Sequence, residues 1–347
     1  MKRIVLFASL LAGAALAAAA PNSEMKAVLD SLASMNPKPL PQLTAAQARK
    51  GPTPADAAKA VLQQKGKSTE PEPVAKVQDL QISGAEGQIP ARIYTPDGKG
   101  PLPVVVYFHG GGWVIANTDV YDSSPRALAN LSKAIIVSVD YRQAPEHKFP
   151  AAHEDAFAAY QWVLQNAASF GGDPARVAVA GESAGGNLAA AVSLMARDRK
   201  AQMPLYELLV YPIAGYDFDT PSYEENATAK PLDKAGMQWF YQQYLNSPKD
   251  AQDPRISLVK ADLHGLPPTT VITAQIDPLR SEGQELATNL KKAGVQVESK
   301  NYDGVTHEFF GMGAVVAAAK DAEKFGADGL KKAFAKPAAK PMGRRAQ

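Results

Sequence analysis

The chain has 347 residues, of which 46% are hydrophobic, 21% are charged and none is cysteine. This length and composition suit one large α/β domain or two smaller ones, and they exclude disulfides and lipid attachment through cysteine. The net charge of +2 hides an acidic body, because Lys2-Arg3 and residues 331–347 hold eight of the basic residues, and the remaining 29 face 35 acidic ones. We therefore expect no nucleic-acid partner.

The first 20 residues have the pattern of a signal peptide. Lys2-Arg3 precede an apolar run from Ile4 to Leu16, and small alanines follow. The run is too short to favour a membrane span, so no stable membrane anchor is expected. Because Pro21 disfavours cleavage directly before it, we expect the cut near Ala18–Ala20, after Ala18 or Ala19, and export to the periplasm or the medium.

Residues 21–73 predict two helices. Apolar residues from Met25 to Met35 recur on one helical face, a proline-rich link covers 37–41, and Thr53-Pro54 is typical of a helix start. The second helix should end near Gly66. Neither helix is followed by a strand of a parallel sheet. We therefore expect that both lie outside the α/β core and form N-terminal cap helices.

Residues 74–330 predict the catalytic domain. Residues 77–83 and 89–95 alternate like an edge hairpin, and from Pro103 to Phe325 strands and helices alternate. Such βα units imply an α/β fold, a mostly parallel twisted sheet with helices on both faces. Residues 212–253 interrupt the pattern with an aromatic-rich stretch that has no strand, which we expect to be a helical cap insertion. The basic segment 331–347 should be a disordered tail.

The sequence from Gly181 to Gly185 predicts a nucleophile. A strand-like run, Val177 to Ala180, ends in Gly181-Glu182-Ser183-Ala184-Gly185, and a helix pattern follows at once. A serine on so sharp a turn has its hydroxyl exposed, and the helix behind it directs free N–H groups at an anion. Gly181 and Gly185 suit the tight turn. The alternative is a merely structural glycine-rich turn.

A second glycine run predicts an oxyanion-binding loop. The buried strand 103–108 is followed by His109-Gly110-Gly111-Gly112. Three glycines leave backbone N–H groups unshielded at the carboxyl end of a strand, where α/β sheets build their sites. An oxyanion requires such fixed donors.

A serine nucleophile needs a base and an orienting acid, which in α/β-hydrolases follow it in the order acid, then histidine. Only two histidines follow Ser183. His264 lies in a loop that leads into a strand and hence at the wrong end of the sheet, whereas His307 follows the strand-like 295–300. Asp277 ends the predicted strand 270–275. Weaker candidates for the acid are Glu282, in a helix, and Asp303, in a turn.

With these motifs, Asp140-Tyr141-Arg142 and Asp277-Pro278-Leu279-Arg280, the chain resembles the bacterial hormone-sensitive-lipase-like esterases over roughly 74–330. The resemblance implies an α/β-hydrolase core with a helical cap and a triad of Ser183, Asp277 and His307. It also implies an oxyanion hole made of the N–H groups of Gly111, Gly112 and Ala184. The family often has Asp or Thr where this chain has Glu182, and an acid where it has Ser281.

These observations predict an exported serine esterase that hydrolyses short- to medium-chain acyl esters and needs no cofactor. No carboxylate or histidine cluster has metal-ligand spacing, and no phosphate-binding glycine fingerprint is present. One alternative is a triad hydrolase of amides, thioesters or lactones. Another is a non-catalytic ligand-binding protein like the plant gibberellin receptors, which lack the catalytic histidine.

Overall fold

The computed structural model describes residues 19–335, so most of the predicted signal peptide and most of the predicted tail lie outside the described residues. Eight strands form one sheet in the order β1-β2-β4-β3-β5-β6-β7-β8. β1 pairs with β2, and β2 with β4, in antiparallel fashion, while all other neighbours are parallel. The strands are β1 Lys76–Ser83, β2 Gln88–Thr95, β3 Leu102–Phe108, β4 Ile135–Val139, β5 Gly172–Glu182, β6 Glu207–Val210, β7 Thr269–Ile276 and β8 Val297–Thr306.

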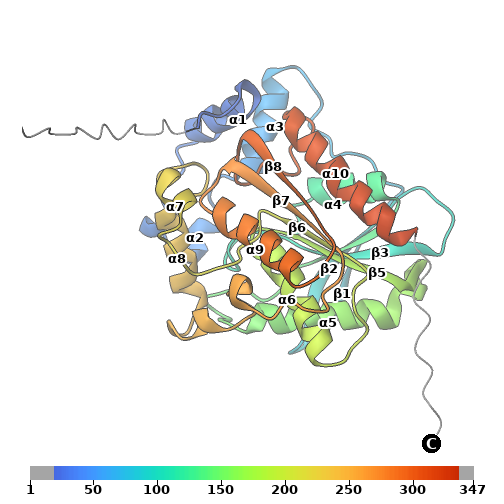
Figure 1. Ribbon diagram of the computed structural model, residues 1–347. Coiled ribbons are helices and arrows are strands. Elements are labelled where there is room, and N and C mark those ends of the chain that lie inside the picture. Colours follow the sequence, from blue (N-terminus) through green and yellow to red (C-terminus); the bar gives the residue numbers. More distant parts are fainter. Residues whose placement is uncertain (1–18, 336–347) are drawn as a thin grey trace, which may run out of the picture.

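Helices cover both faces of the sheet (Figure 1). They are α1 Ser23–Ser34, α2 Ala45–Ala48, α3 Pro54–Gln64, α4 Ser123–Ser132, α5 Ala151–Asn166, α6 Ala184–Asp198, α7 Pro221–Glu225, α8 Lys234–Tyr244, α9 Arg280–Lys292 and α10 Ala317–Phe334. The predicted α/β-hydrolase architecture and the predicted edge hairpin are confirmed.

The central strand β3 shows why the sheet needs both layers. Its residues alternate between two apolar cores: Val104 and Val106 pack with α5, α6 and α9, whereas Val105 and Tyr107 pack with α1, α3, α4 and α10. A strand that is apolar on both sides is stable only between two layers of helices. The carboxyl ends of β3, β5, β7 and β8 therefore meet at one edge of a rigid sheet.

The N-terminal helices pack into the core, so the expectation that they lie outside it was wrong. Met25 and Val28 of α1 are buried in the same core as α10, and the Asn22 N–H donates to the carbonyl of Gly304 in β8 at 2.8 Å. As predicted, Thr53 caps α3, where it exchanges hydrogen bonds with Asp56. Burial of one face of α1 thus ties this segment to the catalytic domain.

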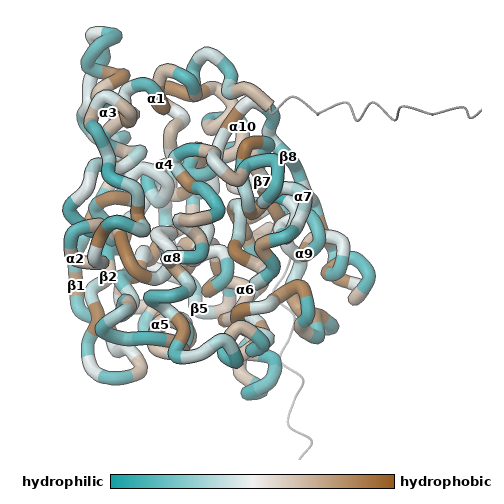
Figure 2. Tube along the Cα trace, turned by 90° about the vertical axis from the view of Figure 1, so that its left-hand side faces the viewer, coloured by the Kyte–Doolittle hydropathy of each residue, from teal (hydrophilic) through white to brown (hydrophobic). Residues whose placement is uncertain are grey.

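The insertion 212–253 contains no strand and carries the helices α7 and α8, as predicted. The indole N–H of Trp239 in α8 donates to the carbonyl of Leu43 at 3.2 Å, so the insertion and the N-terminal segment are joined. Figures 1 and 2 place α7, α8 and α2 on the same side of the molecule. Together they cover the edge at which the predicted site residues lie.

Two predicted boundaries were wrong. β8 runs to Thr306 instead of ending near Lys300, so Asp303 lies in a strand and not in a turn, because pairing with β7 resumes beyond an irregularity at Ala274/Ile276. The domain also extends past residue 330. Helix α10 continues to Phe334, whose side chain is buried against the core, and burial of this apolar residue holds the last turn in place.

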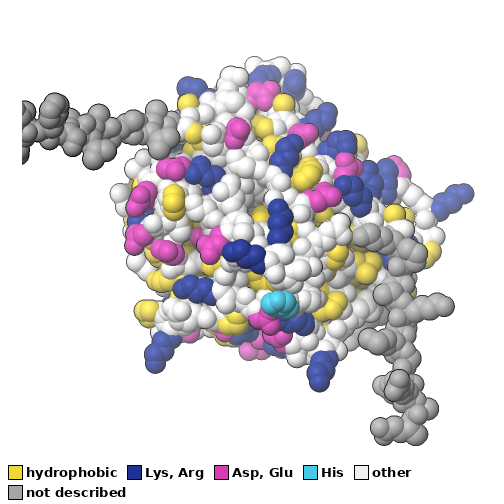
Figure 3. All heavy atoms as spheres, viewed as in Figure 1, with side chains coloured by type: hydrophobic (Ala, Val, Ile, Leu, Met, Phe, Trp, Pro, Cys, Tyr) yellow, Lys and Arg dark blue, Asp and Glu magenta, His cyan; other side chains and the backbone are white. Residues whose placement is uncertain are grey.

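The surface seen in Figure 3 carries basic and acidic side chains of the described residues interspersed with apolar ones. None of the helices in residues 19–335 combines the length and the apolar character needed to cross a membrane.

Candidate active site

Ser183 occupies the turn between β5 and α6 with a strained backbone, φ 57° and ψ −117°. Its N–H donates to the carbonyl of Val210 at 2.9 Å, which holds the turn against β6. Side chains at the flanking glycines would collide with backbone: a Cβ on Gly181 would lie 2.8 Å from the nitrogen of Gly186, and one on Gly185 would lie 2.5 Å from the carbonyl oxygen of His109. The sequence can make this turn only with glycine on both sides.

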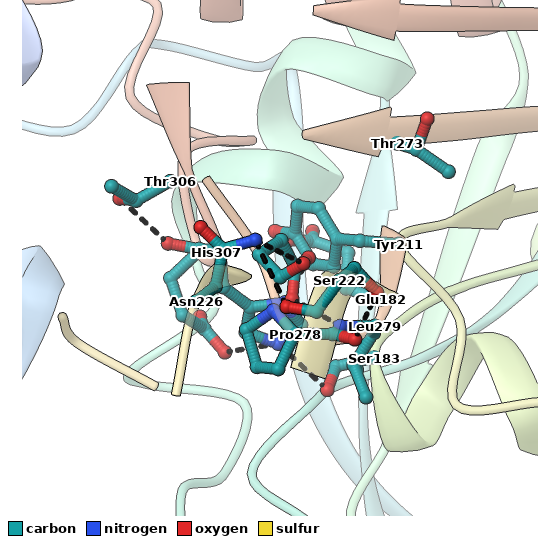
Figure 4. A network of polar contacts seen from close by, with 12 residues as sticks. Glu182, Ser183, Tyr211, Ser222, Asn226, Thr273, Pro278, Leu279, Thr306 and His307 are labelled. Atoms are coloured by element: carbon teal, nitrogen blue, oxygen red, sulfur yellow. Dashed lines mark hydrogen bonds and ion pairs between the residues drawn. The ribbon is translucent and has the colours of Figure 1, made fainter. Parts of the chain in front are cut away.

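The structure brings Ser183, His307 and Asp277 together in one hydrogen-bonded chain. Figure 4 shows His307 and Ser183 in the same polar network. His307 Nε2 lies 2.9 Å from Ser183 Oγ, and its Nδ1 lies 2.7 Å from Asp277 Oδ2. With the imidazole proton on Nδ1, this nitrogen donates to Asp277 and leaves Nε2 free to accept the serine proton. Ser183 itself is only 3% exposed, contrary to the expectation of an exposed hydroxyl, because His307 and the glycine loop close around it.

Asp277 is held in place from both of its oxygens. The carboxyl is fully buried after β7, where Oδ1 accepts the N–H of Leu279 at 2.9 Å while Oδ2 faces His307. The rival acids lie elsewhere. Glu282 accepts the N–H groups of Ala214 and Gly215, and Asp303 accepts a hydrogen bond from Asn301. Only Asp277 among the three contacts His307.

The electrostatics of His307 favour its charged form. Burial opposes the imidazolium, but Asp277 and, more weakly, Glu308 and Glu182 outweigh this effect, so the pKa of His307 is raised above its ordinary value. A base of raised pKa beside a hydroxyl can take and return a proton near neutral pH.

The glycine loop after β3 offers free donors. Gly111 and Gly112 have φ of +93° and +58°, a left-handed conformation that favours glycine. Within the described residues, the N–H groups of Gly111, Gly112 and Ala184 donate to no protein acceptor. Gly110 and His109 support the loop from behind: the Tyr141 hydroxyl donates to the carbonyl of His109 at 2.8 Å. The buried His109 ring stacks on Tyr141 and does not reach Ser183.

A buried carboxyl below the nucleophile was not anticipated as part of the site. Glu182 accepts hydrogen bonds from the hydroxyls of Tyr107 and Tyr211, and burial raises its pKa to about 7. The ring of Tyr211 lies 4.5 Å from that of His307, centroid to centroid. Through Tyr211, Glu182 therefore connects the serine turn to the aromatic ring that packs against His307. The position of Glu182 directly before the nucleophile was a signal in the sequence, but its partners lie in β3 and directly after β6.

Ser281, where the family often has an acid, joins the insertion to the Asp277 loop. Its Oγ accepts the N–H of Ser222 in α7 at 3.1 Å, and Ser222 Oγ accepts the N–H of Ser281 at 2.9 Å and donates to the carbonyl of Pro278. Asn226 donates to the carbonyl of Asp277 at 3.3 Å. Figure 4 shows Ser222 and Asn226 beside Pro278 and Leu279. These contacts fix the loop that carries the acid.

The remaining predicted residues do not join the site. His264 is exposed before β7 and faces Asp262, at the opposite end of that strand from Asp277. In residues 19–335, no three side chains of His, Asp or Glu are grouped so that they could hold a metal ion.

Comparison with known proteins shows which family the chain resembles. Residues 105–311 match the model of a family described by its alpha/beta hydrolase fold. The chain is similar to the carboxylesterase NlhH of Mycobacterium tuberculosis, with 43% identity over 71% of this chain and 79% of that protein. It is 33% identical to an ethyl acetate hydrolase of Pseudomonas putida over 74% of this chain and 81% of that one. Among solved structures, a hyperthermophilic esterase from Pyrobaculum calidifontis superposes with a TM-score of 0.82 at 39% identity, covering 91% of this chain and 100% of that one.

Proposed function

Because this chain belongs to the α/β-hydrolase family, among its hormone-sensitive-lipase-like esterases, and is a carboxylesterase, we propose that Ser183, His307 and Asp277 carry out its ester hydrolysis. The observation that supports this most directly is the hydrogen-bonded chain from Ser183 Oγ through His307 to Asp277.

In the proposed reaction, Ser183 Oγ attacks the acyl carbon while His307 Nε2 takes its proton. The negative charge that develops on the carbonyl oxygen is bound by the N–H groups of Gly111, Gly112 and Ala184, which have no other protein acceptor among the described residues. His307 then gives the proton to the leaving alkoxide. Water, activated by the same nitrogen, releases the acid from the acyl-enzyme.

We propose that the acyl chain is of short to medium length. The support is Phe240 of the insertion, which is 5% exposed and lies directly over Gly112 of the glycine loop. A roof so close to the oxyanion donors limits the space for a long chain. Each methylene that the pocket buries adds about 0.8 kcal/mol until the pocket ends, after which overpacking should reverse the trend. We expect p-nitrophenyl esters of about four to eight carbons to be cleaved best.

The test of the nucleophile is Ser183→Ala. It should lower kcat on p-nitrophenyl butyrate by roughly a million-fold, since no other group can form the acyl-enzyme, and should leave the circular dichroism spectrum and the melting temperature near those of the wild type. More than a few per cent of residual activity would place the nucleophile elsewhere. Parallel assays on matched amides, thioesters and lactones decide between an esterase and the broader triad hydrolase.

Export remains a proposal that rests on residues 1–20. Intact mass of the protein produced in a bacterial host should show a mature start at Ala19 or Ala20. Active protein that retains Met1 in the cytoplasm would contradict it.

A further inference from the structure

A cavity of about 730 Å³ lies between α3 and the segment that follows His307. Its walls include Ala58 and Leu62 of α3, Met312 behind the catalytic histidine, and Tyr121 and Glu308. We call it the α3 cavity. Tyr121 is 6% exposed, whereas the Glu308 side chain is 22% exposed, so the carboxyl of Glu308 lies at the boundary between the cavity and the buried triad.

Glu308 has hydrogen-bonding capacity that the protein does not use. Both of its carboxyl oxygens lie 2.7 Å from the hydroxyl of Tyr121, which has one proton to donate. A carboxyl group can accept about four hydrogen bonds. Within residues 19–335, no lysine or arginine lies within ion-pair distance of Glu308. At least one oxygen therefore keeps free lone pairs.

The basic residues that line the cavity do not pair with Glu308. Arg92 is bound to Asp79 and Asp119, and Arg126 to Asp122. The two lysines of the lining, Lys59 and Lys320, form no ion pair with Glu308 among the described residues. Burial raises the pKa of Glu308, an effect that His307 and Tyr121 oppose. Whether the carboxyl is ionised or protonated, it keeps an oxygen that can accept a hydrogen bond.

One oxygen of this carboxyl group lies near the nitrogen that gives the proton to the leaving group. Glu308 Oε1 is 3.7 Å from His307 Nε2. In the reaction proposed above, the leaving alkoxide must come within about 3 Å of Nε2 to receive its proton. A substituent two or three bonds along the alcohol is then within reach of Glu308, which also lines the α3 cavity.

From this geometry we infer that Glu308 selects the alcohol part of the substrate and favours esters whose alcohol carries a further hydroxyl group, such as monoesters of diols and partial esters of polyols. The inference rests on the proposed function of the triad. The second hydroxyl donates to the free oxygen of Glu308, whereas an alkyl group of the same size leaves that oxygen desolvated and unpaired. Discrimination of this kind is strong because the site, and not only the ligand, loses a hydrogen bond.

The experiment compares 2-hydroxyethyl butyrate with n-propyl butyrate, which have the same acyl group and the same number of heavy atoms. Initial rates of butyric acid release in a pH-stat give kcat/KM for each, and the ratio of the two values is the readout. We expect the wild type to favour the hydroxyl-bearing ester by about tenfold. Glu308→Leu should bring the ratio to about one or below. Glu308→Gln keeps a carbonyl oxygen and should retain part of the preference.

The matched control is Glu70→Gln. Glu70 is an exposed carboxylate that lines the same cavity, and it has no contact with His307 or Tyr121. Its substitution should leave the ratio at the wild-type value. A general effect of charge in the cavity would instead shift the ratio in both variants and would overturn the assignment to Glu308.

If the wild type hydrolyses both butyrate esters with nearly equal kcat/KM, the inference is overturned. This measurement needs no variant, so it decides the question even if Glu308→Leu fails to fold. A ratio that stays near tenfold in folded Glu308→Leu overturns it as well. Failure of the proposed function has a different signature, because wild-type enzyme would then hydrolyse neither butyrate ester.

Discussion

Replacing Gly112 with alanine places a methyl group where Phe240 already lies. A Cβ built on Gly112 would be 2.7 Å from Cε1 of Phe240 and closer still to Cγ and Cδ1, whereas ordinary contact begins near 3.4 Å. Phe240 is 5% exposed and packs edge-on against Trp239 at 5.2 Å between ring centroids. Because the ring cannot retreat without disturbing the insertion, the glycine loop has to move instead.

The expected magnitude has two parts. The left-handed φ of +58° costs a non-glycine residue about 1–2 kcal/mol, and overpacking against a buried ring adds about 1–3 kcal/mol to the loss of folding free energy. If the loop shifts, the Gly112 N–H leaves the oxyanion. Loss of one such donor lowers kcat by about 10²–10³-fold. We expect KM for p-nitrophenyl butyrate to change far less than kcat.

Two further variants separate strain from collision. Gly171→Ala has the same kind of positive φ, +84°, but no atom lies within 4 Å of its new Cβ, so it should cost backbone strain alone and keep wild-type kcat. Adding Phe240→Ala to Gly112→Ala should recover at least tenfold in kcat relative to the single variant. A Gly112→Ala enzyme with kcat within about threefold of wild type would refute the reasoning, as would a double variant that is no faster than Gly112→Ala.

Three other perturbations follow from the geometry. Asp277→Asn should lower kcat by up to about 10⁴-fold with the fold retained, whereas Asp303→Asn should change it little; the reverse ranking would remove Asp277 from the triad. Glu182→Gln removes a charge that raises the pKa of His307, so the acidic limb of the kcat/KM profile should move to lower pH, and an unmoved limb would contradict this coupling. Glu207 is buried at the start of β6 with a pKa of about 7, above its unfolded value. The folded protein therefore binds the Glu207 proton more tightly than the unfolded chain does, so Glu207 lowers the free energy of unfolding as pH rises from about 4.5 to 7. Glu207→Gln should reduce this decline by about 2–3 kcal/mol, measured by urea unfolding. An equal pH dependence of the unfolding free energy in the wild type and in Glu207→Gln would contradict this role of Glu207.

Much of the site follows from local patterns in the chain. The turn at Ser183 requires a strand, two small residues and a helix in direct succession, and all of these are contiguous. The triad order then points to Asp277 and His307, since each follows a predicted strand. Period-two alternation and turn chemistry are short-range properties, so they predicted the edge hairpin, the βα units and the strandless insertion. The resemblance to a known family supplied the assignment of the oxyanion donors.

Contacts between distant segments were decided only by the tertiary structure. Glu182 meets Tyr107 and Tyr211 because β5 lies between β3 and β6 in the sheet, an order that no local pattern contains. Glu308 comes to the α3 cavity because α1 and α3 pack into the core and bring the N-terminal segment over the loop after β8. The extra length of β8 depends likewise on its partner β7. Side-chain period and turn residues indicate which face of an element is buried, but the choice of neighbour depends on packing between elements that are far apart in the chain.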